Sequence, residues 1–191
     1  MRGKFFRVTD YFALLQLPRS AVLGLDQIKA AYRHGMSSAH PDKTGAAPDA
    51  AIQLNEARRI LSDPALRLRH LLELEGIEIP DTLPPHLEWD LAERIGRTVD
   101  AARTFAPHTS SDSILLKAVK QKKADQLEAE FREMDQLLRS GRDAQLEKAN
   151  LYPRQEPLKA LSAVVFFQKQ LRLLASALSQ LREKSQRDGP L

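Results

Sequence analysis

The sequence predicts an all-α protein, and composition and patterning both support this. Leu, Ala, Arg, Gln, Glu and Lys dominate the chain, and these residues form helices readily. β-Branched residues are scarce, and no stretch alternates apolar and polar residues long enough to indicate a strand. With 191 residues, of which 42% are hydrophobic and 28% charged, the chain can form one or two globular domains with a sizeable core.

The N-terminal part is predicted to begin with two helices. A short helix through Leu15, capped by Thr9 or Asp10, ends before Pro18. After a loop, we expect a second helix with Asp26 as its N-cap. Its apolar residues recur at helical spacing and so share one face: Ile28, Ala31, Tyr32 and Met36.

The other face of this second helix carries two basic residues four positions apart, Lys29 and Arg33, with His34 beside them. Like charges at this spacing destabilise an isolated helix by a few tenths of a kcal/mol. An acidic partner would offset that cost, whereas a solvated face would simply tolerate it. The charge pattern alone favours the solvated face.

The turn that follows contains the most informative residues of the chain, His40-Pro41-Asp42-Lys43. Pro41 lacks an N–H and biases His40 away from helical geometry, so the helix must end near residue 39. Asp42 can accept hydrogen bonds from nearby backbone and tighten the turn. A histidine close to an aspartate is also compatible with acid–base catalysis, but no nucleophile or oxyanion hole accompanies it. An exposed recognition loop is the favoured interpretation.

Two more helices complete this part of the chain. The third is expected over 49–61, with Ala50, Leu54, Ala57 and Leu61 on one face. Asp63 can cap the fourth, which begins at Pro64, runs to residue 75 and stops at Gly76.

In order and spacing, these elements resemble a J domain over approximately the first 75 residues. The matching stretches are Asp10-Tyr11-Phe12-Ala13-Leu14-Leu15, Ile28-Lys29-Ala30-Ala31-Tyr32-Arg33, His40-Pro41-Asp42-Lys43, Leu54-Asn55-Glu56-Ala57 and Ile60-Leu61-Ser62-Asp63-Pro64. In J domains, a DnaK-type chaperone requires the loop triplet for stimulation of its ATPase and binds the basic face of the second helix. The resemblance therefore implies that the chaperone-binding residues are His40, Pro41, Asp42, Lys29 and Arg33, with Lys43 nearby.

Two residues depart from the usual J-domain pattern. Gly35 lies inside the second helix, where glycine costs about 1 kcal/mol relative to alanine. Arg58 occupies a position of the third helix where an aromatic residue is frequent. Neither residue belongs to the loop triplet, so we expect a locally softer hairpin that keeps its activity.

The remaining sequence narrows the resemblance to the HscB group, the co-chaperones of iron–sulfur cluster assembly. A Gly/Phe-rich linker and a cysteine-rich zinc module are missing from the sequence, and Leu71-Leu72-Glu73-Leu74-Glu75-Gly76 directly follows the J-like part. Members of this group join a J domain to a C-terminal helical bundle. We therefore expect a J domain over 1–76, a linker over 77–85, a three-helix bundle over 86–184 and a tail over 185–191.

The three bundle helices follow from apolar spacing. The first carries Leu87, Leu91, Ile95, Ala102 and Phe105, and Pro107 terminates it. The second is expected over 113–139 with Gly141 as its stop, and a separate helical turn is expected within 143–150. The third is expected over 157–183.

In the HscB group the first bundle helix presents an apolar and acidic patch to the cluster-scaffold protein. The matching positions give three client-binding candidates, Leu87, Trp89 and Leu91. Trp89 lies off the stripe of the other two, so it is either an exposed contact or part of a second buried face.

This segment also departs from the family. Glu88 stands where a leucine is expected, and Arg94 and Arg97 follow where the family is more acidic. The identity of the client therefore stays open.

Composition argues against several other classes of protein. The chain has no cysteine, which excludes disulfides and thiolate metal sites, and its five histidines lack the spacing of metal ligands. No Gly-rich phosphate loop is present, so we expect no bound ATP. Taken together, these observations predict a protein without a metal or a cofactor. The N-terminus lacks the apolar run of a secretory signal, and no segment is long enough to span a bilayer. We expect a cytoplasmic protein without a membrane partner.

The leading hypothesis is a co-chaperone that is not itself an enzyme. It would stimulate ATP hydrolysis by a DnaK-type, HscA-like chaperone and present a client, the IscU-like iron–sulfur scaffold. One alternative is a J-domain co-chaperone for a different client. Another is a basic helical nucleic-acid-binding protein, but the net charge is only +4 and the one tight basic cluster is Lys120, Lys122 and Lys123. We therefore expect no nucleic-acid partner, and an enzyme with His40 as its base is weaker still.

Overall fold

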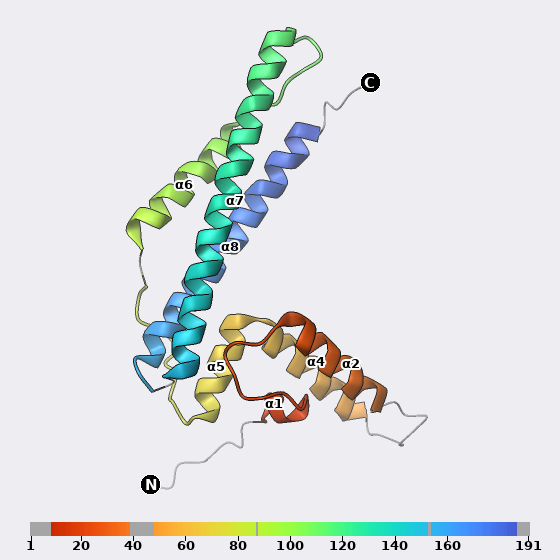
Figure 1. Cartoon of the computed structure of the whole chain (residues 1–191), viewed down its shortest axis with the longest axis vertical. Coiled ribbons are helices and arrows are strands. Elements are labelled where there is room, and N and C mark those ends of the chain that lie inside the picture. Colours follow the sequence, from red (N-terminus) through yellow and green to blue (C-terminus); the bar gives the residue numbers. More distant parts are fainter. Residues whose placement is uncertain (1–8, 39–47, 87, 153, 187–191) are drawn as a thin grey trace. The chain divides into compact units, whose positions relative to one another are not determined.

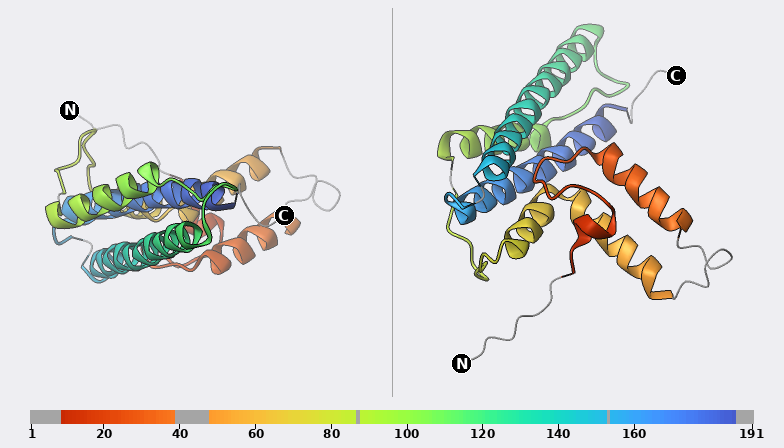
Figure 2. Two further views of the ribbon diagram at one scale, coloured as in Figure 1. Left: turned by 90° about the horizontal axis from the view of Figure 1, so that it is seen from above. Right: turned by 60° about the horizontal axis from the view of Figure 1, so that its bottom comes forward.

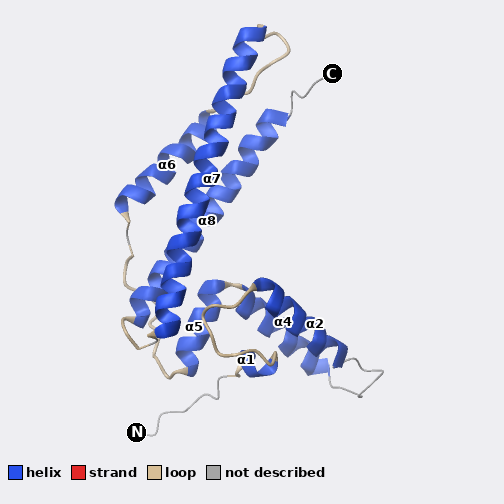
Figure 3. Cartoon of the chain, in the orientation of Figure 1, coloured by secondary structure: helices blue, strands red, loops and turns tan. Residues whose placement is uncertain are grey.

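The computed structural model confirms the all-α fold class. It describes residues 9–38, 48–86, 88–152 and 154–186, and within these ranges every regular element is a helix (Figure 3). The helices are α1 (Tyr11–Leu14), α2 (Leu25–Ser38), α4 (Pro48–Ser62), α5 (Pro64–Leu74), α6 (Trp89–Thr104), α7 (Ile114–Leu151) and α8 (Pro157–Gln186). None of these described helices is both long and apolar enough to cross a membrane.

The chain divides into two compact units. Unit 1 comprises Met1–Pro84 and Asp143–Val164, and unit 2 comprises Pro85–Arg142 and Val165–Leu191. The last turns of α7 and the first turns of α8 thus belong with the N-terminal helices, although apolar spacing alone groups them with the bundle. The expected domain boundaries at residues 76 and 85 stay predictions.

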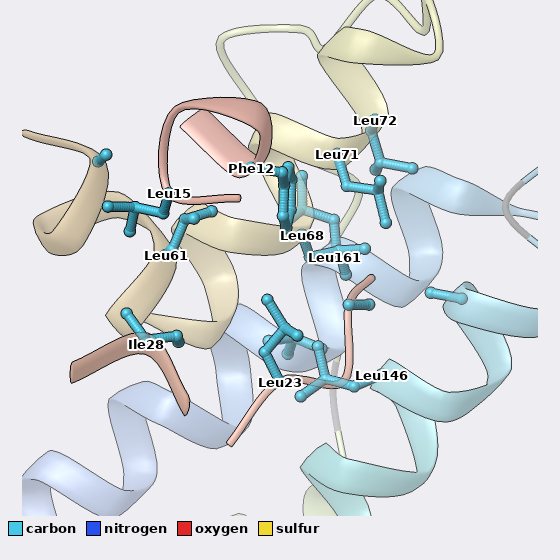
Figure 4. Close-up of a cluster of buried hydrophobic side chains, with 14 of the residues drawn as sticks. Phe12, Leu15, Leu23, Ile28, Leu61, Leu68, Leu71, Leu72, Leu146 and Leu161 are labelled. Carbon is cyan, nitrogen blue, oxygen red and sulfur yellow. The ribbon is translucent and has the colours of Figure 1, made fainter. Parts of the chain in front are cut away.

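The core of unit 1 shows why those turns belong to it (Figure 4). Leu146 of α7 and Leu161 of α8 are 4% and 1% exposed, and both lie in the same hydrophobic cluster as the N-terminal helices. The other fully or nearly fully buried members of the cluster are Phe12, Leu15, Ala21, Leu23, Ile28, Leu54, Ala57, Leu61, Leu68, Leu71, Leu72, Ala149, Ala160 and Val164. Burial of a leucine side chain contributes about 1.5–3 kcal/mol, so these turns add substantially to the stability of unit 1.

Local capping fixes the ends of α1 and α5, as the sequence predicts. Asp10 Oδ1 accepts hydrogen bonds from the N–H groups of Phe12 and Ala13, at 3.0 and 3.1 Å. Asp63 Oδ1 does the same for the first turn of α5, at 2.9 and 3.1 Å. Gly76, with φ of 75°, follows the last turn of α5 in the left-handed conformation that glycine adopts without strain.

Two predicted helix boundaries are wrong. Asp26 lies in the first turn of α2, which begins at Leu25, so it is not the N-cap. Gly141 does not stop α7, which continues to Leu151 and absorbs the separate turn expected after it. The reason is close packing: a Cβ at Gly141 would lie 2.7 Å from Cζ of Phe167 on α8. Glycine at this position serves the contact between two helices rather than a C-terminus.

Unit 2 is built from α6, the larger part of α7 and the larger part of α8, and Figures 1 and 2 show the three helices side by side. Its buried apolar residues are Ile95, Val99, Ala102, Ala124, Leu127, Phe131, Met134, Leu138, Phe167, Leu174, Ala177 and Leu181. Lys184 of α8 donates from Nζ to the carbonyl oxygen of Arg103 at 2.6 Å and to that of Ala102 at 3.4 Å. A cation placed on the last carbonyls of α6 stabilises the end of that helix.

Candidate functional site

Helices α2 and α4 pack against each other as a hairpin (Figure 2), and α2 carries two of the six predicted chaperone-binding residues, Lys29 and Arg33. Ile28 of α2 and Leu61 of α4 are fully buried between the helices and the rest of the unit 1 core. Gly35 lies against Leu54, and a Cβ at Gly35 would be 3.0 Å from Leu54 Cδ2. The glycine that sequence analysis treats as a softening of the helix therefore permits a close approach of α2 to α4.

Two side-chain contacts of Tyr32 also link α2 to α4. The Tyr32 hydroxyl of α2 donates a hydrogen bond to Asn55 Oδ1 of α4 at 2.8 Å. Arg58 Cζ lies 4.8 Å from the centroid of the Tyr32 ring, and a cation–π contact at an exposed site contributes about 0.5–1 kcal/mol. Arg58, which stands where J domains often have an aromatic residue, thus links α4 to α2 by other means.

The basic face of α2 is exposed. Lys29 Nζ lies 3.6 Å from Asp26 Oδ1 one turn earlier, a long and solvated ion pair. Arg33 is exposed and makes no ion pair with any other residue of the described ranges. Both side chains can therefore meet an acidic partner without breaking a buried interaction.

The other four predicted chaperone-binding residues, His40, Pro41, Asp42 and Lys43, lie outside the described residues. They belong to the connection between α2, which ends at Ser38, and α4, which begins at Pro48.

Two buried polar residues of α5 support this hairpin, and sequence reasoning missed both. Arg67, 3% exposed, donates from Nε to the Ala21 carbonyl at 2.9 Å and from Nη1 to the Leu61 carbonyl at 2.6 Å. Charged donors make stronger hydrogen bonds than neutral ones, and their loss leaves buried carbonyls without partners. Arg67 therefore ties α5 both to the loop before α2 and to the end of α4.

His70 is the second of these residues, and it is also 3% exposed. Its Nε2 accepts a hydrogen bond from the Tyr11 N–H at 3.2 Å, and its ring stacks 5.7 Å from the ring of Phe12. Burial lowers the pKa of His70 below its usual value, against the opposing effect of Glu73. Because only the neutral imidazole can accept at Nε2, the native contact to α1 needs the unprotonated form.

The Asp10 carboxylate at the start of α1 has its own electrostatic support. Burial raises the pKa of Asp10, but the Ala13 N–H and the Arg19 guanidinium together lower it below its usual value. The Arg19 contact is short, at 2.7 Å from Nη2 to Oδ2. The cap of α1 therefore stays ionised at neutral pH.

The predicted client-binding segment lies at the start of α6. Trp89 is 73% exposed, which decides between the two alternatives for this residue. Leu91 is half-buried, and Leu87 lies outside the part of the chain that the structure describes. Among the described residues of this segment, Trp89 therefore has the most exposed apolar side chain.

Ion pairs modify the charge of α6. Arg94 Nη2 lies 2.8 Å from Glu133 Oε2 of α7, and Arg97 Nη1 lies 3.1 Å from Glu93 Oε1 one turn away. The two arginines that depart from the family pattern are thus matched by acidic neighbours, so this face is close to neutral rather than strongly basic.

Comparison with known proteins identifies the family. The DnaJ domain model matches residues 10–70. A protein named Co-chaperone protein HscB homolog from Burkholderia mallei is 31% identical over 151 residues, which are 70% of this chain and 80% of that protein. This chain belongs to the HscB co-chaperone family. HscB homologues from Paraburkholderia phymatum and Burkholderia cenocepacia are each 35% identical over 97 residues, which cover 42% of this chain and 55% of theirs. The chain thus spans about half the length of these two curated relatives.

Solved structures of HscB proteins agree in fold. Chaperone HscB from Vibrio cholerae aligns with a TM-score of 0.51 and 18% identity, over 92% of this chain and 96% of that one. Human co-chaperone protein HscB aligns with a TM-score of 0.52 and 16% identity, over 96% and 91%. The J domain, the HscB resemblance and the all-α architecture expected from the sequence are all confirmed.

Proposed function

We propose that this HscB-family co-chaperone stimulates ATP hydrolysis by a DnaK-type, HscA-like chaperone through its J domain. The chaperone would meet the basic face of α2, with Lys29 and Arg33, and the adjoining residues His40, Pro41, Asp42 and Lys43. The chain itself would bind no nucleotide and catalyse no reaction.

The observation that supports this proposal best is the exposure of Lys29 and Arg33 on α2, a helix that contacts α4 through Gly35 and Tyr32. Exposed charges of one sign raise the rate of encounter with an oppositely charged surface and fix the orientation of docking. A rigid helix holds such charges at defined positions, which lowers the entropy lost when they bind.

Steady-state ATPase assays of a DnaK-type chaperone test the role of the loop. We expect the wild-type protein to raise the rate and His40→Gln to abolish the increase. The control is His108→Gln, which alters a histidine in the loop between α6 and α7, away from the predicted chaperone-binding residues, and should keep full stimulation. Equal stimulation by wild type and His40→Gln would contradict the proposal.

We further propose that α6 contacts the client, and that this client is the IscU-like iron–sulfur scaffold protein. The exposed Trp89 is the leading contact, with Leu87 and Leu91 beside it in the sequence. Truncation of an aromatic residue at the centre of an interface typically weakens binding by about 2 kcal/mol or more. Titration of the purified scaffold into full-length protein should therefore show a loss of more than about tenfold for Trp89→Ala. The control Tyr152→Ala removes another exposed aromatic side chain and should leave the affinity unchanged.

A different client is the second candidate, and the charge of α6 is the observation that favours it. The Arg94–Glu133 and Arg97–Glu93 pairs make this face less acidic than the family pattern. If the scaffold fails to bind while the chaperone ATPase is stimulated normally, the J-domain function stands and the client is another protein.

A further inference from the structure

The first ten residues of α7, Ile114–Lys123, form a segment with no core function, which we call the α7 tip. None of its side chains is buried, and the first buried residue of α7 is Ala124. Figure 1 shows the tip at one end of unit 2, where α7 begins beyond the ends of α6 and α8. The folding of unit 2 therefore does not explain the composition of this segment.

The α7 tip nevertheless carries four large aliphatic side chains. Ile114, Leu115 and Val119 are 89%, 76% and 57% exposed, and Leu116 is 42% exposed. Such a concentration of exposed aliphatic residues within two helical turns is unusual for a surface without a binding role. Side chains with so high an exposure project from the surface rather than line a groove.

The lysines of the α7 tip are equal in number to the net positive charge of the protein, +4. The tip contains four lysines, Lys117, Lys120, Lys122 and Lys123, and no acidic residue, while the rest of the chain has equal numbers of basic and acidic side chains. Lys120 pairs with Asp112 at 2.8 Å. Within the described ranges the other three lysines form no ion pair, so their charge is available to an external partner.

We propose that the α7 tip is a docking surface for an anionic lipid bilayer, which departs from the expectation, drawn from the sequence alone, of a protein without a membrane partner. Projecting aliphatic side chains together with lysines are the two components of interfacial membrane binding, because the first enter the acyl boundary and the second attract anionic headgroups. A second copy of this chain fits poorly, since it would bring two sets of lysines together. A stable protein interface needs about 800 Å² on each partner, which is more than a segment of about three helical turns provides alone. Insertion into a bilayer has no such minimum area.

Sedimentation of full-length protein with lipid vesicles tests the proposal. We expect binding to phosphatidylcholine vesicles that contain about 30% phosphatidylserine, and binding at least about tenfold weaker to vesicles of phosphatidylcholine alone. The variant Ile114→Ser/Leu115→Ser/Val119→Ser should lose at least about tenfold in partitioning. Lys122→Gln/Lys123→Gln should lose about tenfold or more, since each lysine near an anionic surface contributes about 1 kcal/mol.

Two controls separate the α7 tip from other exposed apolar residues. Leu137→Ser/Leu151→Ser changes two leucines that are 46% and 69% exposed elsewhere on α7, and it should bind vesicles as the wild type does. Phe5→Ser/Phe6→Ser changes an N-terminal stretch in which apolar and basic residues lie close together in the sequence, and it too should keep binding.

The proposal would be overturned if the protein did not bind anionic vesicles or bound neutral vesicles equally well. It would also be overturned if the serine variant of the tip bound vesicles as the wild type does, or if either control lost binding. Concentration-dependent dimerisation that the tip variant abolishes, without vesicle binding, would assign the surface to a second copy instead. Retention on an acidic protein but not on vesicles would assign it to a protein partner. The tip variants and the Leu137→Ser/Leu151→Ser control should show wild-type helical circular dichroism, because the side chains that they alter are exposed.

Discussion

The contact of Gly141 with Phe167 gives a quantitative test of how α7 and α8 pack. In a helix, replacing glycine by alanine usually stabilises the protein by about 0.5–1 kcal/mol. At Gly141 the added Cβ would lie 2.7 and 2.8 Å from Cζ and Cε1 of the Phe167 ring. That ring is itself confined, because His86 and Phe166 lie 5.8 and 5.6 Å from it, centroid to centroid. Overpacking of this kind costs about 1–3 kcal/mol.

Gly96 of α6 is the matched control, since a Cβ there would meet no atom within 4 Å. We expect Gly96→Ala to raise the free energy of unfolding by about 0.5–1 kcal/mol. Gly141→Ala should gain the same helix propensity but also incur the cost of overpacking. The free energies of unfolding of the two variants should therefore differ by about 1–3 kcal/mol. In a protein of this size each kcal/mol corresponds to about 2–4 °C in Tm.

Urea and thermal unfolding followed by circular dichroism measure the difference. The double variant Gly141→Ala/Phe167→Leu removes the atoms that the new Cβ would strike, so it should be more stable than the sum of the single changes predicts. If Gly141→Ala stabilises the protein as much as Gly96→Ala, the inferred close contact between α7 and α8 is wrong.

Three further predictions concern buried and capping polar groups. The pKa of His70 is lowered in the native state, so the unfolded chain binds more protons below about pH 6.5. The free energy of unfolding should therefore be highest above that pH and should fall as the pH decreases from the unfolded-state pKa to the native-state pKa of His70. Urea unfolding should show a smaller fall for His70→Gln. Asp63→Ala removes two hydrogen bonds to the first turn of α5 and should lower the free energy of unfolding by about 1 kcal/mol. An unchanged unfolding midpoint would contradict this prediction. Lys184→Met removes the cation from the carbonyls that end α6 and should cost about 1 kcal/mol, whereas Lys159→Met, at an exposed position on α8, should have little effect.

Much of the N-terminal architecture could be predicted from local sequence. Asp10, Asp63 and Gly76 end or start helices through contacts with residues only two to four positions away, so their roles are visible in the sequence. The basic face of α2 follows in the same way from the four-residue spacing of Lys29 and Arg33.

The errors arise where a residue serves a contact that is distant in sequence. Gly141 reads as a helix stop by local rules, but its reason is Phe167 on another helix. Arg67 looks like a solvated arginine, yet it pairs with backbone carbonyls, including that of Ala21, which approach it only in the folded state. The apolar spacing of Leu146 and Leu161 indicates helices without revealing which unit they pack against.

The candidate site was predicted only in part for the same reason. Exposure of Trp89 could not be inferred, because an indole off the main apolar stripe fits either a second buried face or the surface. The predicted roles of His40 and its neighbours depend on the family resemblance, and they remain predictions.

The central claim is that the basic face of α2 docks on a DnaK-type chaperone. The most direct measurement is ATPase stimulation by Lys29→Glu/Arg33→Glu, compared with the charge-reversal control Arg69→Glu/Lys159→Glu at exposed positions on α5 and α8. We predict that the α2 variant loses stimulation by about tenfold or more, that the control keeps it, and that wild-type stimulation weakens as salt rises from about 0.05 to 0.5 M. Full stimulation by the α2 variant, or an equal loss in the control, would contradict this account.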